Sequence, residues 1–105
     1  MANSRFELQS LLEKIPGVAN VYFQPPSNIQ LRYPCIIYKR SSNNVRYADN
    51  RKFFKRRSYE VTVIDRNPDS PIAEFMESLS YCRFDRVFAT DSLYHFVYTL
   101  YLDKE

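Results

Sequence analysis

Residues 93–102, LYHFVYTLYL, are apolar on both faces when the segment is drawn as a β-strand. Alternate side chains of a strand point to opposite faces, so one face carries Tyr94, Phe96, Tyr98 and Leu100, and the other carries Leu93, Val97 and Tyr101. Such a strand is either central in a covered sheet or buried between subunits. The chain has 105 residues, which predicts one domain, because single domains cluster near ~100–150 residues.

An amphipathic helix is expected near the N-terminus. Ser4 and Glu7 fit a capping box, in which the two residues satisfy each other's free backbone N–H groups. Apolar residues then recur at helical spacing and share one face: Leu8, Leu11, Leu12 and Ile15. Pro16-Gly17 should end this helix. A helix this short is marginal alone, so its apolar face requires a sheet.

A second helix is expected after a turn at residues 67–71. Ser70 can cap its N-terminus, and Pro71 suits its first turn. The same helical spacing recurs there, which predicts a buried stripe of Ile72, Phe75, Met76 and Leu79.

Five strands account for most other residues, at 18–24, 35–40, 59–65, 83–89 and 93–102. Thr90-Asp91-Ser92 is a turn between the last two. The element order α-β-β-β-α-β-β predicts an α+β fold, with two helices packed on a mostly antiparallel sheet. We expect residues 1–105 to form this single domain, with residues 43–57 as an extended basic hairpin or loop.

Positive charge is concentrated in one segment. Residues 39–57 hold eight Lys or Arg and one acid, a net charge of +7, whereas the other residues sum to −4. Within it, residues 43–57 have no clear hydrophobic period, and we expect a long β-hairpin with a mobile tip. Aromatic residues placed between Lys and Arg residues occur in proteins that bind single-stranded nucleic acid. An acidic protein surface would attract the segment equally well. A merely solvated hairpin is the third interpretation.

The sequence offers little catalytic chemistry. Gly17 is the single glycine, whereas phosphate-binding loops need several. The single histidine, His95, lies mid-strand among apolar neighbours, so a core or interface role is favoured over a nucleophilic pair with Cys35 or Cys82. Both cysteines lie in apolar runs, which predicts small buried side chains.

Four aspartates, Asp65, Asp69, Asp85 and Asp91, could in principle hold magnesium. They fall at strand ends and turns, where Asp commonly bonds the local backbone. We therefore expect no enzyme, no metal and no cofactor.

Membrane signals are also weak. No segment reaches the ~18–20 apolar residues that span a bilayer, and the first residues lack the apolar core of a signal peptide. We expect synthesis in the cytosol and no membrane partner.

Three features carry a family resemblance: Tyr33-Pro34 before an apolar strand, YADN at 47–50, and YEVTVID at 59–65. The pattern continues with Asp69-Ser70, Asp85-Arg86 and the LYH that opens the last strand. In this order and spacing, the chain from residue 33 onward resembles tail terminator, tail completion and minor tail proteins, which are encoded among the head–tail genes of long-tailed phages and prophages.

The resemblance implies a structural virion subunit that forms a ring with copies of itself, expected to be a hexamer. Such a ring caps the finished tail tube, ends the polymerisation of the tail tube protein and docks on the head connector or stopper protein. Phage DNA passes through the channel of the ring. The subunit would assemble in the host cytoplasm and remain in the neck of the virion.

Contacts between subunits, or with docking partners, are expected at the basic segment. The residues assigned to them are Lys39, Arg40, Arg46, Tyr47, Asp49, Asn50, Arg51, Lys52, Lys55, Arg56 and Arg57. The alternative is a small nucleic-acid-binding regulator that uses the same hairpin. A third interpretation, a nuclease accessory or enzyme, would require magnesium-dependent activity.

Overall fold

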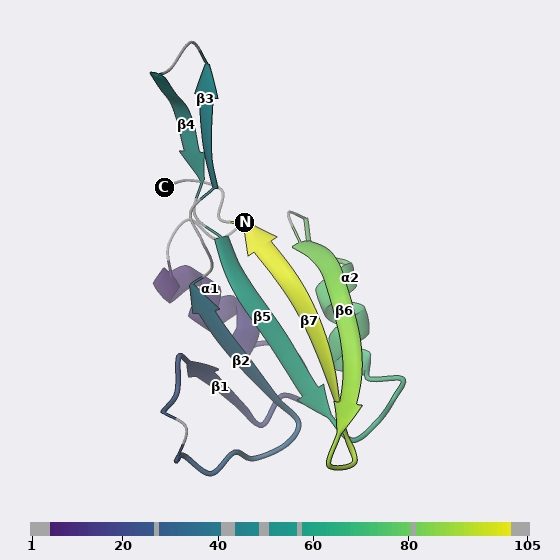
Figure 1. Cartoon of the computed structure of the whole chain (residues 1–105). Coiled ribbons are helices and arrows are strands. Elements are labelled where there is room, and N and C mark those ends of the chain that lie inside the picture. Colours follow the sequence, from purple (N-terminus) through teal and green to yellow (C-terminus); the bar gives the residue numbers. More distant parts are fainter. Residues whose placement is uncertain are drawn as a thin grey trace.

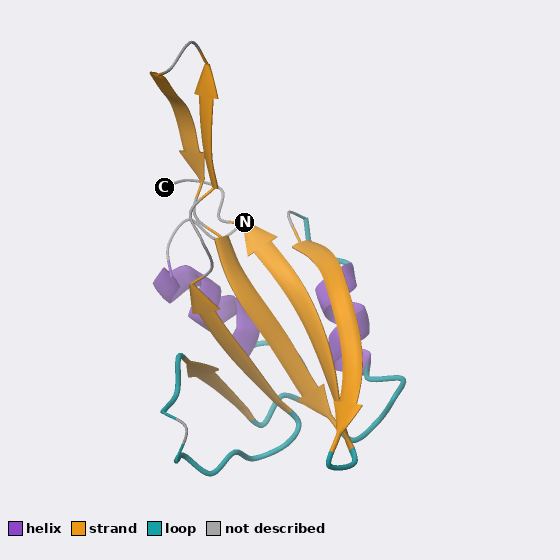
Figure 2. Cartoon of the chain, in the orientation of Figure 1, coloured by secondary structure: helices purple, strands orange, loops and turns teal. Residues whose placement is uncertain are grey.

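The computed structural model describes residues 5–26, 28–40, 44–48, 51–56, 58–80 and 82–101, with 44–48 and 51–56 described as backbone only. Two helices and a five-stranded, mostly antiparallel sheet form an α+β fold, as the sequence predicts (Figures 1 and 2). The elements are α1 (Arg5–Glu13), β1 (Asn20–Phe23), β2 (Cys35–Arg40), β3 (Asn44–Ala48), β4 (Arg51–Arg56), β5 (Ser58–Asp65), α2 (Pro71–Glu77), β6 (Cys82–Thr90) and β7 (Leu93–Tyr101).

The main sheet has the strand order β1-β2-β5-β7-β6. β1 runs parallel to β2, and all other neighbours in this sheet are antiparallel. β7 lies between β5 and β6, so the strand that is apolar on both faces is internal to the sheet, which is one of the two positions that its pattern allows. β3 and β4 pair with each other in a separate two-stranded sheet.

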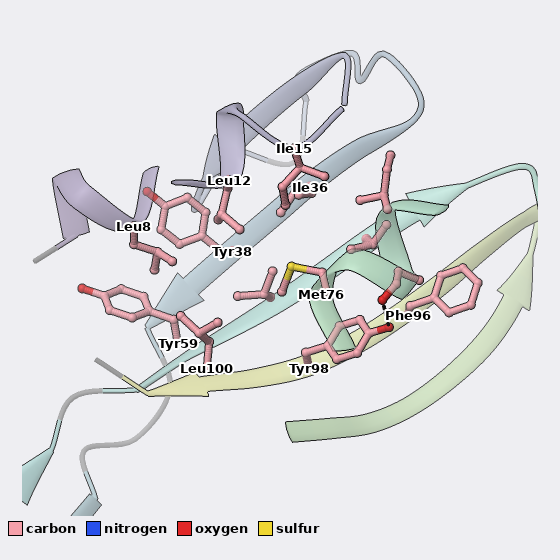
Figure 3. Packing of buried hydrophobic residues seen from close by; sticks show 14 residues of the cluster. Leu8, Leu12, Ile15, Ile36, Tyr38, Tyr59, Met76, Phe96, Tyr98 and Leu100 are labelled. Atoms are coloured by element: carbon pink, nitrogen blue, oxygen red, sulfur yellow. Dashed lines mark hydrogen bonds between the residues drawn. The ribbon is translucent and has the colours of Figure 1, made fainter. Parts of the chain in front are cut away.

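Both helices cover the same face of the main sheet (Figure 3). Leu8 and Leu12 of α1 and Met76 of α2 are fully buried against alternate residues of the central strands. The sheet side of this core is aromatic and β-branched, which suits a pleated, half-buried surface: Ile36, Tyr38, Tyr59, Val61, Val63, Phe96, Tyr98 and Leu100.

The first helix ends earlier than the sequence predicts. α1 stops at Glu13, and Ile15 lies beyond it, although its side chain is buried. The backbone N–H groups of Lys14 and Ile15 donate to the carbonyls three residues earlier, at 3.2 and 3.3 Å, which is the tighter pattern of a closing helix turn. Gly17 then takes a φ of 92°, a conformation that glycine adopts without strain.

The second helix starts as predicted, but its buried stripe differs. The Ser70 hydroxyl accepts a hydrogen bond from the Ala73 N–H at 3.4 Å, and Pro71 is the first helical residue. The expectation that Phe75 faces the core is wrong, because its side chain is 37% exposed. Ala73 packs inward with Ile72 and Met76 instead. The side of the helix that faces the sheet therefore includes Ala73 in place of Phe75.

Two buried tyrosine hydroxyls provide a matched test of this core. The Tyr98 hydroxyl donates to the Ala73 carbonyl at 3.1 Å and lies 3.2 Å from the Glu77 carboxylate. The Tyr59 hydroxyl is buried and has no hydrogen-bond partner among the described residues.

We expect Tyr98→Phe to lower the free energy of unfolding by ~1–2 kcal/mol, because it removes a buried hydrogen bond. Tyr59→Phe should leave the free energy of unfolding unchanged or raise it, because it removes a hydroxyl that is buried without a partner. Urea unfolding of both variants checks this, and equal destabilisation by the two would contradict the assignment.

Candidate interaction surface

β3 and β4 form a two-stranded ribbon, here called the arm, that projects past one end of the main sheet (Figure 1). The arm is inserted between two neighbouring strands, because Arg40 at the end of β2 still pairs with Tyr59 near the start of β5. The molecule is correspondingly elongated, with extents of 49 × 26 × 24 Å. The arm therefore adds reach without interrupting the sheet.

The residues assigned to contacts from the sequence follow the arm and its base. Lys39 and Arg40 are exposed at the end of β2. The backbone of β3 contains Arg46 and Tyr47, and that of β4 contains Arg51, Lys52, Lys55 and Arg56. The register pairs Tyr47 with Lys52. Asp49, Asn50 and Arg57, and with them the predicted tip, lie outside the described residues.

The sheet face opposite the helices, here called the open face, is the second surface of interest. Register places its residues in rows across the strands: Ile37, Thr62, Val97 and Arg86 are successive partners on β2, β5, β7 and β6. Val97 is buried even though it faces away from the helices. The open face is thus partly covered by another part of the chain.

The covering segment is the connection between β1 and β2. Gln24 anchors its start, because the Gln24 N–H donates to the Tyr38 carbonyl at 2.9 Å and its side-chain oxygen accepts from the Arg40 N–H at 3.3 Å. Leu31 and Tyr33 of this connection line a pocket together with the open face. Two bonds to β2 therefore hold the start of the connection beside the end of this strand.

The connection and the sheet enclose a groove of two adjoining pockets, about 660 and 370 Å³ in volume. Leu31, Ile37 and Lys39 line both pockets, so the groove is continuous. The larger pocket adds, towards the end of β2, Gln24, Pro25, Pro26, Ile29 and Arg40. The groove, as the term is used below, is lined mainly by apolar residues, and its charged lining residues are Lys39, Arg40, Arg86 and the acid Glu60.

Three charged side chains, Lys39, Glu60 and Arg86, line the smaller pocket of the groove. Glu60 on β5 lies 3.8 Å from the Lys39 ammonium and 3.6 Å from the Arg86 guanidinium, and Arg86 also lies 3.2 Å from Asp85. Lys39 and Arg86 keep more than half of their side-chain surface exposed. Such exposed pairs contribute only ~0–1 kcal/mol each, and Lys39 remains accessible to an anionic partner.

The far end of the groove is aromatic. Phe88 on β6 is the register partner of His95 on β7, and their rings stack with centroids 4.7 Å apart and planes 9° from parallel. The His95 Nδ1 atom is buried and has no hydrogen-bond partner among the described residues. His95 thus serves here as a flat ring that packs against Phe88.

The structure does not bring His95 together with either cysteine. Ile64 stands between Cys35 and His95 in the register, so two strand spacings, or ~10 Å, separate their backbones. Cys82 pairs with Leu100 on β7, and Leu100 belongs to the core under the helices. Cys35 is buried as predicted, whereas Cys82 is only partly buried.

Burial raises the pKa of both thiols to about 11, with the charge of Glu77 as a further, smaller cause at Cys82. A nucleophilic cysteine requires the opposite shift, towards the thiolate. Both thiols are therefore protonated near neutral pH.

Three of the four aspartates that the sequence offers as metal ligands take part in local hydrogen bonds or ion pairs. Asp65 accepts from the Asn67 N–H at 3.1 Å, Asn67 accepts from the Asp69 N–H at 2.9 Å, and Asp85 pairs with Arg86. In the part of the chain that the structure describes, no three His, Cys, Asp or Glu side chains are grouped as metal ligands.

Sequence reasoning missed the groove and the exposed side of β6. Phe84, Val87 and Phe88 are exposed on this edge strand, where the sequence indicated only a strand with apolar residues. The groove depends on the crossing of the β1–β2 connection, for which only Pro25-Pro26 was a local signal.

No family model, curated protein or solved structure matches this chain. Among the described helices, neither has the length and apolar character needed to cross a membrane.

The raised thiol pKa values predict a fall in stability at alkaline pH. An unfolded chain loses its thiol protons near the ordinary value of 9.0, whereas the folded chain keeps them to about 11. The stability that the two protonated thiols contribute is therefore fully present below pH 9 and is lost as the pH rises from 9 to 11.

Urea unfolding at pH 8 and pH 10 should show this loss, and the variant with Cys35→Ala and Cys82→Ala should lose less. An equal loss in the variant would contradict the burial of these thiols.

Proposed function

We propose that this chain is a structural subunit of the tailed-bacteriophage virion, which forms a ring at the head-proximal end of the tail. The ring ends the polymerisation of the tail tube protein and joins the tail to the head connector or stopper protein. Assembly takes place in the host cytoplasm, and phage DNA passes through the ring.

The arm is the observation that carries this proposal. A ribbon that leaves the body between two paired strands adds reach without a core of its own. Its sequence is strongly basic, so it is suited to an acidic surface on a neighbouring subunit, tube or connector, where complementary charge speeds docking and selects the partner.

The arrangement of the body supports the same function. In this proposal the helices and the strands of the main sheet follow the order α-β-β-β-α-β-β along the chain, and the basic hairpin is inserted between the second and third of these strands. In this proposal, contacts are made by three parts of the molecule, namely the arm, the groove and the β6 edge. The action is therefore steric and electrostatic: copies associate, cover the end of the tube and present the arms for docking.

Charge reversal in the arm tests the function. Arg56→Glu with Arg57→Glu should reduce the yield of infectious particles by at least ~100-fold, because like charges across a docked interface cost several kcal/mol. The readout is complementation of a phage that lacks the chain, with separated heads and tails counted by electron microscopy.

The matched control is Lys14→Glu with Arg66→Glu, which changes the net charge equally at two exposed bases outside the arm. Both variants should keep the wild-type thermal unfolding midpoint. A normal yield from the arm variant, or an equal loss in the control, would count against the proposal.

The second candidate is a nucleic-acid-binding regulator, which the aromatic residues between the bases of the arm favour. It predicts that the free protein binds DNA with an affinity that falls steeply with salt, because each phosphate contact releases counterions. The structural proposal predicts that the arm variant fails in particle assembly. The regulator predicts altered transcription with normal particles.

A further inference from the structure

The outer surface of α2 is acidic and aromatic. The exposed residues of this helix include Glu74, Phe75 and Glu77, and no Lys or Arg lies within it. Phe75 is 37% exposed, and the exposed Glu74 precedes it in the helix. The Tyr98 hydroxyl bonds the Glu77 carboxylate, so this charge lies on another side of the helix from Phe75. These three residues are here called the α2 knob.

The larger pocket of the groove has the complementary chemistry. Its floor is formed by Pro25, Pro26 and Ile29 together with Leu31 and Ile37, and Ile29 is 42% exposed. Two cations, Lys39 and Arg40, lie at its edge. An apolar pocket with a basic edge fits an apolar side chain that carries acidic neighbours.

One copy cannot join these two surfaces to each other. The α2 knob lies on the helix side of the sheet, where α2 packs near β6, whereas the pocket lies on the open face beside β1 and β2 (Figure 1). The two surfaces are therefore on opposite faces and towards opposite edges of the sheet. Contact between them requires a second molecule.

We propose that the groove of one copy receives the α2 knob of a second copy, with Phe75 in the apolar pocket and Glu74 beside Arg40. This inference rests on the proposed function and names the surfaces that join its subunits. The contact is head-to-tail, since each copy offers a groove on one side and a knob on the other. Contacts of this type close into rings when the rotation between copies permits.

A charge swap tests this pairing. Arg40 and Glu74 are exposed, so neither substitution should lower the thermal unfolding midpoint. We expect Arg40→Glu alone, and Glu74→Lys alone, to weaken self-association at least ~10-fold, because each places like charges together at the interface. Sedimentation over a range of concentrations up to millimolar gives the association constants.

Two rescues are specific to a groove–knob contact. The chain with both substitutions should regain wild-type self-association to within about threefold. Mixing the two single variants should also restore assembly. The acidic groove of the Arg40→Glu variant accepts the basic knob of the Glu74→Lys variant, and the unchanged knob of the Arg40→Glu variant fits the unchanged groove of the Glu74→Lys variant. As a control, Arg40→Glu combined with Glu13→Lys, which reverses an acid of α1, should not be rescued.

The outcomes separate this inference from the proposed function. Loss of self-association without rescue would overturn the pairing, because Arg40 and Glu74 would then act at different contacts. If neither single variant weakens association, the pairing is overturned although the ring stands. A wild-type chain that stays monomeric up to millimolar concentration would also overturn the pairing. Failure of the proposed function is seen separately, as normal particle yield from the arm variant.

Discussion

The pairing of β5 with β7 is the constraint on which the rest of the structure depends. The two strands are joined in continuous register from Ser58 and Tyr101 to Asp65 and Tyr94. One face of this pair is buried under both helices, and the other forms the floor of the open face. A slip of one residue would exchange these faces, exposing the Tyr98 side of the core and burying Glu60.

The position of the arm follows from the same sheet. β2 and β5 remain paired up to Arg40 and Tyr59, so the arm begins where the body is already closed. An insertion of this kind is free of the demands of core packing, as surface connections generally are. This freedom accounts for a segment whose net charge opposes that of the other residues.

The fold class was predictable because its signals are local. Leu8 and Leu12 recur at helical spacing, and Tyr59, Val61 and Val63 alternate along a strand; all five are buried in the core. Phe75 was mispredicted because a short helix allows two neighbouring stripes, and packing against the sheet selects between them. The parallel pairing of β1 with β2 has no local signal.

The candidate surface was predictable only in part. Charge density identified the segment that forms the arm and its base, with Lys39 and Arg40 at the base. Their surroundings were not predictable, since Glu60, Arg86 and the β1–β2 connection meet them only in the folded sheet. The α2 knob likewise requires knowledge of which side of α2 packs inward.

Cryo-electron microscopy of the intact particle tests the central claim most directly, with this chain traced into the density of the neck. The account predicts a ring of copies between the tail tube and the head connector, with the arms in contact with neighbouring protein. A particle in which the chain is absent, or lies away from the junction of head and tail, would contradict it.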